Sequence, residues 1–381
     1  MRTLVPRPED FTSTARGPAT TARIGLWLGV AFTTCFVTGF WSHLQYAPPA
    51  WLPLGPSPSW LYRLTQGLHV ISGVAAIPLL LVKLWSVFPR LFLRPPITPI
   101  CTALLHGLER LSVLVLVGAA IFQVVSGSLN IVQWYPWDFS FRATHEAVAW
   151  IAIGAIAVHV AVKLPTIRSA FATTIAPGAD EVSAGPGRRT VVRAALLSSG
   201  LAALLTAGQT VPGLRRISVF GVRDGGGPQG LPVNRTARAA GATAAASDRS
   251  FALEVRSGAR QVMLTRAQLA ELPQQTHHLP IACVEGWSQT AEWTGPTVLD
   301  VLALVDAPEG SSVLVQSMQT RGAFRTSVLP AAYVADHRTL LALKLNGEDL
   351  SLDHGFPCRI IAPNRPGVLQ TKWVRSLEAR T

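Results

Sequence analysis

Apolar and polar residues follow different patterns in the two halves of the chain. Within the first 210 residues, five apolar runs approach the roughly 20 residues that a helix needs to cross a bilayer. They lie near residues 24–45, 65–88, 111–133, 145–164 and 191–209. From Phe251 onward, the apolar runs are short and are separated by turn formers, as in FALEV, VMLT, LPIACV, SVLVQS and CRIIAP. These runs predict strands, and helical patterns occur near 265–272, 296–305 and 330–345.

The two patterns predict an all-α transmembrane bundle of about five helices followed by an α+β domain. A Gly-, Pro-, Ala- and Arg-rich stretch between them, with GGGPQG at 225–230, is interpreted as a linker. The mean hydropathy of +0.33 and the 14% of charged residues agree with a membrane part. We divide the chain into a cytoplasmic N-terminal segment (1–23), a four-helix membrane domain (24–170), a cytoplasmic linker with the fifth span (171–209), an extended linker or arm (210–250) and a soluble domain (251–381).

Basic residues are distributed unequally among the loops that connect the predicted spans. Two loops contain only Arg63 and Arg142, whereas thirteen basic residues lie in the other connections: Arg2, Arg7, Arg16, Arg23, Lys83, Arg90, Arg94, Arg110, Lys163, Arg168, Arg188, Arg189 and Arg193. Because positively charged loops stay in the cytoplasm, the N-terminus is predicted to be cytoplasmic and the chain after residue 210 to be extracytoplasmic. The predicted outer side also carries an aromatic belt: Trp41, Trp51, Trp60, Trp134, Tyr135 and Trp137.

The net charge of +12 does not indicate nucleic acid binding, because the excess lies mainly in the hydrophobic half. The first 210 residues hold 15 basic and 7 acidic side chains, and the remainder holds 18 and 14. The four cysteines, Cys35, Cys101, Cys283 and Cys358, are widely separated and include no CxxC pair. Neither a disulfide framework nor a zinc module is therefore expected.

Three histidines, His69, His145 and His159, fall within predicted spans, and His43 at the outer end of the first span is an alternative candidate or a surface group. Ionisable side chains are costly inside a bilayer, so each is a functional candidate. The fourteen residues from His145 to His159 correspond to about 21 Å of helix rise, which would place one ligand near each membrane surface. Facing imidazoles are typical ligands of b-type haem. We expect His69 and His145 to bind an outer haem and His159 to bind an inner one, whereas interfacial histidines in a plain anchor are the alternative.

GLHVISG at 67–73 and HEAVAWIAIGAIAVH at 145–159 resemble the bacterial cytochrome b561 and hydrogenase cytochrome b family, over roughly residues 20–170. The resemblance implies one or two haem b groups and exchange of electrons with membrane quinone or quinol. In that family a first-span histidine commonly precedes a tryptophan. This chain departs from the pattern, because Leu26-Trp27 stands at the matching place.

Cys283 lies in ACVEGWS at 282–288, at the end of an apolar run. A lone cysteine is most often a buried structural thiol, but a soft thiolate also suits a transition metal. Basic residues follow near the C-terminus in LDHGFPCRIIAPNRPGVLQTKWV at 352–374, and such groups can hold an anionic cofactor. Solvated basic loops are the alternative interpretation.

The order of CVEGWS, Trp293-x-Gly295, NGEDLSLDHGFPCR and TKWV resembles the sulfite-oxidase family of molybdopterin enzymes over about residues 228–380. The resemblance implies that Cys283 is the molybdenum ligand and the catalytic cysteine. It further implies that the cofactor is bound by seven residues: Asn234, Arg235, His354, Arg359, Gln370, Thr371 and Lys372. Sulfite-oxidising members usually have an arginine shortly before the metal cysteine, but this chain has His277 and His278 there.

Together these features predict a multi-pass enzyme of the cell membrane, a molybdopterin-dependent oxidoreductase that carries out oxygen-atom or two-electron transfer outside the cytoplasm. Its expected partners are the lipid bilayer, quinone or quinol, and a small sulfoxide-like or sulfite-like substrate. One alternative is a molybdenum enzyme on a haem-free anchor with a soluble electron carrier. Another is a non-catalytic binding or sensory module. Arg188-Arg189 before the weakly apolar fifth run resembles an internal twin-arginine export signal, with simple positive-inside anchoring as the alternative.

Overall fold

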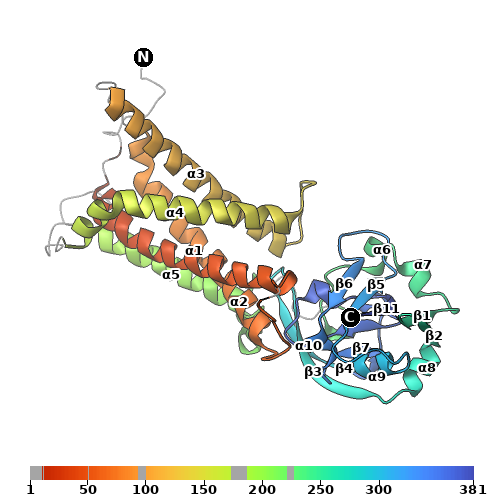
Figure 1. Cartoon of the computed structure of the whole chain (residues 1–381). Coiled ribbons are helices and arrows are strands. Elements are labelled where there is room, and N and C mark those ends of the chain that lie inside the picture. Colours follow the sequence, from red (N-terminus) through yellow and green to blue (C-terminus); the bar gives the residue numbers. More distant parts are fainter. Residues whose placement is uncertain (1–10, 12, 50, 93–99, 173–186, 221–226) are drawn as a thin grey trace. The chain divides into compact units, whose positions relative to one another are not determined.

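A computed structural model describes residues 11, 13–49, 51–92, 100–172, 187–220 and 227–381 (Figure 1). Three arginines from the topology prediction, Arg2, Arg7 and Arg94, lie outside these described residues. The chain divides into two compact units. Unit 1 comprises Met1–Phe40, Leu68–Gly208 and Arg216–Phe220, and unit 2 comprises Trp41–Gly67, Gln209–Arg215 and Gly221–Thr381.

Five long helices occupy the first half of the chain, as the apolar runs predict. They are α1 (Pro18–Tyr46), α2 (Leu61–Val87), α3 (Ile100–Ile131), α4 (Phe141–Ala172) and α5 (Arg188–Ala207). Each is long and apolar enough to cross a membrane. Large apolar side chains such as Leu114 and Leu197 are exposed on them, at 68% and 73%. Apolar side chains favour a non-aqueous surrounding, so this surface suggests a membrane protein.

A buried apolar cluster and an interhelical hydrogen bond join α1, α2 and α5 within unit 1. Ile24, Leu79 and Ala195 form a buried cluster. The hydroxyl of Ser199 donates to the carbonyl of Ala75 on α2, with an oxygen–oxygen distance of 2.6 Å. Close helix packing through small residues and interhelical hydrogen bonds is typical of membrane bundles.

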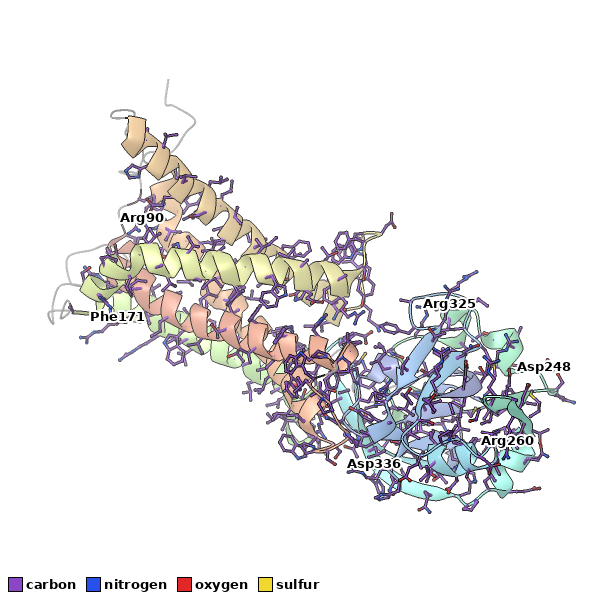
Figure 2. All side chains as sticks on the ribbon, viewed as in Figure 1. Arg90, Phe171, Asp248, Arg260, Arg325 and Asp336 are labelled. Atoms are coloured by element: carbon purple, nitrogen blue, oxygen red, sulfur yellow. The ribbon has the colours of Figure 1, made fainter. Side chains whose placement is uncertain are left out.

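Within the described residues, the C-terminal part of unit 2 contains three sheets, and side chains fill its interior densely (Figure 2). The five-stranded sheet has the order β2-β1-β11-β5-β6, with β1 and β11 parallel and the other neighbours antiparallel. The remaining sheets have the orders β3-β4-β8-β9 and β10-β7. The strands are β1 (Ala252–Ser257), β2 (Arg260–Thr265), β3 (Gln275–Ala282), β4 (Ser288–Gly295), β5 (Ser312–Ser317), β6 (Thr326–Leu329), β7 (Leu340–Ala342), β8 (Lys344–Leu345), β9 (Glu348–Asp349), β10 (Arg359–Ile361) and β11 (Val374–Arg380).

Two hydrophobic clusters form the core of this part. The first packs the alternating apolar residues of β1, β5 and β11 against α9 (Val298–Ala303) and α10 (Ala331–Val334), and it includes Cys358. The second contains Cys283, Trp287 and Trp293. Strand β10 contributes to both clusters, because successive residues of a strand point to opposite faces: Ile360 packs with Cys358 in the first cluster, and Ile361 packs in the second.

Two segments differ from the expectations drawn from sequence. The helix expected at 330–345 is wrong: only Ala331–Val334 is helical, and Leu340, Leu341 and Ala342 form β7 because all three are buried and pair with β10. Residues 265–272 and 296–305 do contain the helices α8 (Arg266–Glu271) and α9.

The segment expected as an extended arm contains two short helices, α6 (Ala237–Ala240) and α7 (Thr243–Ala246). Four of its alanines are buried around Trp373: Ala237, Ala240, Ala242 and Ala246. Alanine and glycine content alone indicated a linker, but alanine is also the strongest helix former and fits closely against a large aromatic ring.

Gly295→Ala is expected to destabilise unit 2 by about 1–3 kcal/mol, because a Cβ there would lie 2.2 Å from the Leu341 carbonyl oxygen. That oxygen belongs to the backbone of the sheet region and cannot rotate away. Thermal unfolding of the purified protein measures the loss. Gly213→Ala is the control, since a Cβ at Gly213 would meet nothing within 4 Å. Equal melting temperatures for the two variants would contradict the prediction.

Candidate functional site

Cys283 lies in a tight turn between β3 and β4. Its N–H donates to the carbonyl of Trp287, and the N–H of Gly286 donates to the carbonyl of Cys283, each at 3.0 Å. Gly286 has a φ of 95°, a left-handed conformation that glycine adopts without strain. The turn places the Cys283 side chain, which is 1% exposed, at the end of β3.

The surroundings of Cys283 disfavour a bare thiolate. Burial raises the pKa of the thiol, and the neighbouring Glu285 carboxylate raises it further. Glu285 is buried as well and accepts a hydrogen bond from the Trp287 indole at 2.9 Å. A sulfur in this position loses its proton when a metal cation binds it. Sequence reasoning gave no role to Glu285, whose only signal was its position two residues after the cysteine.

Lys372 connects the C-terminal segment with the loop at Asn234 and Arg235. Its ammonium donates to the Asn234 side-chain oxygen at 3.1 Å, to the Arg235 carbonyl at 2.6 Å and to the Asp353 carbonyl at 2.9 Å. Burial lowers the pKa of Lys372 to about 7, Arg359 lowers it too, and the charges of Asp353 and Cys283 oppose the shift. The structure thus brings Asn234, Arg235 and Lys372 together, and Lys372 lies within electrostatic range of the Cys283 sulfur.

His354 and Arg359 lie in the same region. The Arg359 guanidinium donates to the His354 carbonyl at 3.0 Å and to the Gln370 carbonyl at 3.2 Å. The His354 ring nitrogen Nε2 lies 2.8 Å from the Pro228 carbonyl oxygen. Burial lowers the pKa of Arg359 to about 9, and burial together with the charge of Arg359 lowers the pKa of His354 to about 4.

Gln370 and Thr371 are buried, and their side chains have protein partners. The Gln370 amide nitrogen donates to the Arg365 carbonyl at 2.9 Å, and the Thr371 hydroxyl oxygen lies 2.8 Å from the hydroxyl oxygen of Ser327. Three nearby buried atoms have no hydrogen-bond partner within the described residues: Arg359 Nε, Arg235 Nε and Gln370 Oε1. Unsatisfied buried polar atoms are costly, so two guanidinium donors and an amide acceptor fit an anionic heteroaromatic ligand.

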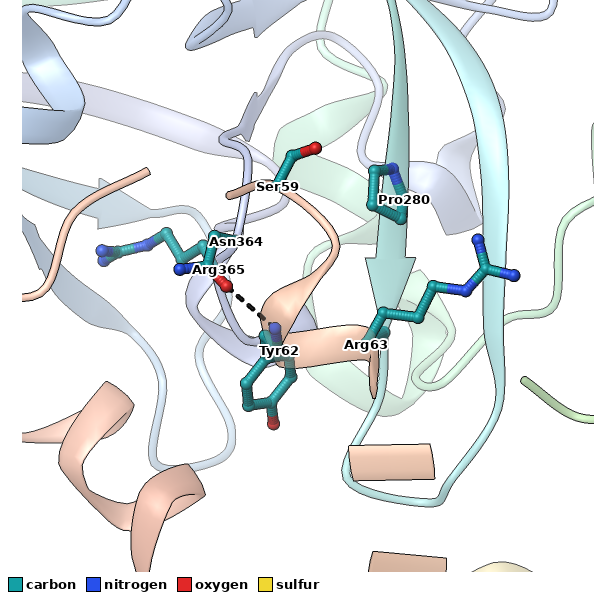
Figure 3. A pocket seen from close by; sticks show the side chains of 7 residues that line it. Ser59, Tyr62, Arg63, Pro280, Asn364 and Arg365 are labelled. Atoms are coloured by element: carbon teal, nitrogen blue, oxygen red, sulfur yellow. Dashed lines mark hydrogen bonds between the residues drawn. The ribbon is translucent and has the colours of Figure 1, made fainter. Parts of the chain in front are cut away.

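A small pocket lies beside Ala282, the residue before Cys283 (Figure 3). Arg63 and Arg365 point away from one another there, so the two cations do not converge on one anion. Arg365 instead donates to the Leu369 and Val328 carbonyls at 3.1 and 2.6 Å. The pocket is lined by Ser59, Tyr62, Arg63, Pro280, Ala282, Asn364 and Arg365.

In unit 1, the rings of His69 and His145 face each other with their centroids 6.2 Å apart. Nδ1 of His69 lies 2.9 Å from the Cys35 carbonyl oxygen, and Nδ1 of His145 lies 2.9 Å from the Ser126 hydroxyl oxygen. These contacts engage Nδ1 and leave Nε2 of each ring as the metal-binding nitrogen. Two imidazoles on opposite sides of one metal ion, each with a metal–nitrogen bond of about 2 Å, have ring centroids about 6 Å apart.

Glycines lie beside both rings. A Cβ at Gly39 would lie 3.0 Å from Cε1 of His69, and one at Gly127 would lie 3.6 Å from Cε1 of His145. The missing side chains at Gly39 and Gly127 let the backbone of each neighbouring helix approach these imidazoles closely. His159 has different surroundings, because the charges of Lys83, Lys163 and Glu109 act on it. Its role as ligand of an inner haem stays a prediction.

Comparison with known proteins identifies the C-terminal domain. Residues 240–381 match the family described as oxidoreductase molybdopterin binding domain. The mitochondrial sulfite oxidase of Drosophila melanogaster is 29% identical over 150 residues, which cover 32% of this chain and 26% of that protein. The sulfite oxidase of Arabidopsis thaliana is 33% identical over 110 residues, which cover 24% of this chain and 28% of that protein.

A third relative is the putative protein-methionine-sulfoxide reductase subunit YedZ1 of Azospira oryzae. It is 28% identical over 109 residues, which cover 29% of this chain and 39% of that protein. The chain therefore spans about a quarter to two fifths of the length of these relatives. Its C-terminal part is a molybdopterin-binding domain of the oxidoreductase type. The likeness of the first half to cytochrome b561 stays a prediction.

In the cofactor-free protein, the contribution of Lys372 to stability is expected to increase as the pH rises from about 7 to 9, because the pKa of Lys372 is about 7 in the folded chain and near 10.4 in an unfolded one. Between these values the unfolded state binds one more proton, so raising the pH favours the folded state. Lys372→Met should reduce the slope of unfolding free energy against pH by up to about 1.4 kcal/mol per pH unit.

Denaturant unfolding at several pH values measures this slope. Lys344→Met is the matched control, because Lys344 is an exposed lysine of β8 in the same unit. The prediction is wrong if Lys372→Met and Lys344→Met have the same dependence on pH.

Proposed function

We propose that this chain is a membrane-bound molybdopterin-dependent oxidoreductase that transfers an oxygen atom or two electrons on the extracytoplasmic side. In this proposal, b-type haem exchanges electrons with membrane quinone or quinol. The observation that carries the proposal is the pair of hydrogen bonds that joins Lys372 to Asn234 and Arg235, with Lys372 within electrostatic range of Cys283, inside a matched molybdopterin-binding domain. The sequence motifs that resemble sulfite oxidases supply exactly these residues from distant parts of the chain.

Cys283 would bind molybdenum through its sulfur, and the proton of the thiol would leave as the metal binds. Lys372, Arg359 and Arg235 would balance the negative charge of the pterin and its phosphate. Gln370 would add an amide oxygen that accepts a hydrogen bond from the ring. His354 and Thr371 contact protein groups, so they would support the walls of the site and hold the backbone that closes over the pterin.

Bound molybdenum–pterin supplies oxygen-atom transfer with a change of two electrons. With X as the reduced form and XO as the oxidised form of the substrate, the reaction is XO + 2H⁺ + 2e⁻ → X + H₂O, or its reverse. Sulfoxides and sulfite are substrates of this kind. The absence of an arginine among the residues just before Cys283, where His277 and His278 stand, favours a substrate with less negative charge than sulfite, such as a sulfoxide.

His69 and His145 would hold one haem b, since their ring separation fits bis-imidazole ligation and both Nδ1 atoms are already engaged. His159 would ligate a second haem. Haem iron changes by one electron at a time, so it would divide the two-electron chemistry at molybdenum into single steps. The distribution of basic residues supports a cytoplasmic N-terminus and an extracytoplasmic C-terminal domain.

Cys283→Ala is expected to abolish molybdenum binding, because alanine removes the metal ligand from a turn that otherwise keeps its backbone hydrogen bonds. Elemental analysis of the purified, folded protein measures molybdenum per chain. Cys358→Ala is the matched control, since Cys358 is an equally buried free thiol in the other core cluster. A full molybdenum content in Cys283→Ala would refute the assignment of the ligand.

His145→Ala is expected to remove the iron of the outer haem and to reduce the dithionite-induced b-type absorption band of purified membranes. Molybdenum content should stay unchanged, because His145 and Cys283 belong to different units. His278→Ala, which changes an exposed histidine of β3, is the control. Well-folded wild-type protein with molybdenum but without iron would instead support a haem-free anchor that uses a soluble electron carrier.

A further inference from the structure

The backbone of the Cys283 turn is held by residues from outside the molybdopterin-binding domain. The side-chain amide of Gln66 donates to the Val284 carbonyl at 3.2 Å, and the Thr210 hydroxyl donates to the Gly286 carbonyl at 3.4 Å. The N–H of Ser288 donates to the Gln209 carbonyl at 2.9 Å. All of these residues belong to unit 2, so the contacts lie within one compact body.

Gln66 is buried, with 5% of its surface exposed, and both ends of its amide are engaged. While its nitrogen donates to Val284, its oxygen accepts a hydrogen bond from the Ser42 hydroxyl at 3.4 Å. A primary amide can donate and accept at once, and leucine of similar size can do neither. Replacing Gln66 by an apolar residue would remove this donor from the partly buried Val284 carbonyl.

The start of α2 is fixed independently on the same domain. The backbone N–H of Tyr62 donates to the side-chain oxygen of Asn364 at 2.8 Å, the bond drawn in Figure 3. The Asn364 amide nitrogen in turn donates to the Gly55 carbonyl at 2.9 Å. Loss of the Gln66 contact would therefore leave the first turn of α2 in place and release only the Val284 carbonyl.

We propose that Gln66 is a positioning residue that couples the turn of Cys283 to helix α2 and forms part of the route for electrons between them. This inference rests on the proposed function. Val284 directly follows Cys283, and His69 follows Gln66 by three residues within the continuous helix α2. The route from the Cys283 sulfur to α2 consists of covalent bonds and the single hydrogen bond from Gln66 to Val284.

The electrons balance along this route. Reduction of one XO consumes two electrons and two protons and gives X and water, and one quinol supplies both electrons and releases two protons. With both cofactors bound, electrons would pass Gln66 one at a time between a haem held by His69 and molybdenum held by Cys283. Oxidation of X by water reverses every step and reduces quinone.

The test uses the full-length holoenzyme with Gln66→Leu. The rate of single-turnover electron transfer between molybdenum and haem should fall severalfold, because leucine replaces the hydrogen bond with a van der Waals contact that couples the two segments more weakly. The Mo(V) electron paramagnetic resonance signal should shift as the Cys283 turn relaxes. Thr65→Val is the matched control, because the Thr65 hydroxyl donates only to the Leu61 and Tyr62 carbonyls of its own helix.

Gln66→Glu adds a readout that a purely structural role would not affect. An ionised carboxylate cannot donate to the Val284 carbonyl, whereas the protonated acid can. The electron-transfer defect of Gln66→Glu relative to wild type should therefore decrease as the pH falls through the pKa of the introduced carboxyl, and the defect of Gln66→Leu should not. Burial of this position would raise that pKa toward neutrality.

Wild-type rates and an unchanged Mo(V) signal in folded Gln66→Leu would overturn the inference. A pH-independent defect in Gln66→Glu would overturn it as well. Failure of the proposed function has a different signature, because wild-type holoenzyme would then lack molybdenum or reducible haem. Metal content and the absorption spectrum of the wild type therefore separate the two failures.

Discussion

The candidate site depends on the burial of positive charge around a buried sulfur. Arg359 is buried and Lys372 is partly buried, and burial lowers the pKa of each. Burying a cation without a compensating anion costs roughly several kcal/mol, so buried cations in proteins usually have an anionic partner. The carbonyl oxygens around Lys372 offset part of this cost. An anionic cofactor would supply the remaining charge, and the unsatisfied Nε atoms of Arg359 and Arg235 are consistent with a ligand that accepts hydrogen bonds.

The turn that carries Cys283 is held by contacts from two parts of the chain. Strands β3 and β4 fix the ends of the turn that carries Cys283, and Trp287 and Glu285 complete it from within. Gln66 and Thr210 complete it from segments that adjoin the long helices. The turn is therefore part of a compact unit that includes Trp41–Gly67, and the molybdopterin-binding domain by itself would expose two of its carbonyl groups.

In unit 1, neighbouring groups orient the rings of His69 and His145. Each ring has one nitrogen engaged by a neighbour, Cys35 or Ser126, and a glycine beside its Cε1 atom. A fixed Nδ1 sets the direction in which Nε2 points, which is how outer contacts orient histidine ligands of metals. His159 lies on the same helix as His145, but the charges of neighbouring side chains act on it. The two histidines of this helix therefore have different surroundings.

The sequence by itself determined the five long helices and the sheet-containing domain, because apolar periodicity reflects burial directly. From order and spacing that resemble a known family, the sequence also predicted a cofactor site at Cys283 and the basic C-terminal residues, and this assignment stays a prediction. It did not predict β7 at Leu340–Ala342 or the packing of Ala237–Ala246 around Trp373. Only the tertiary structure decided these, and only it revealed Glu285 beside Cys283 and Gln66 on Val284. Such contacts join residues far apart in the chain or depend on backbone carbonyls, and neither leaves a pattern in the sequence.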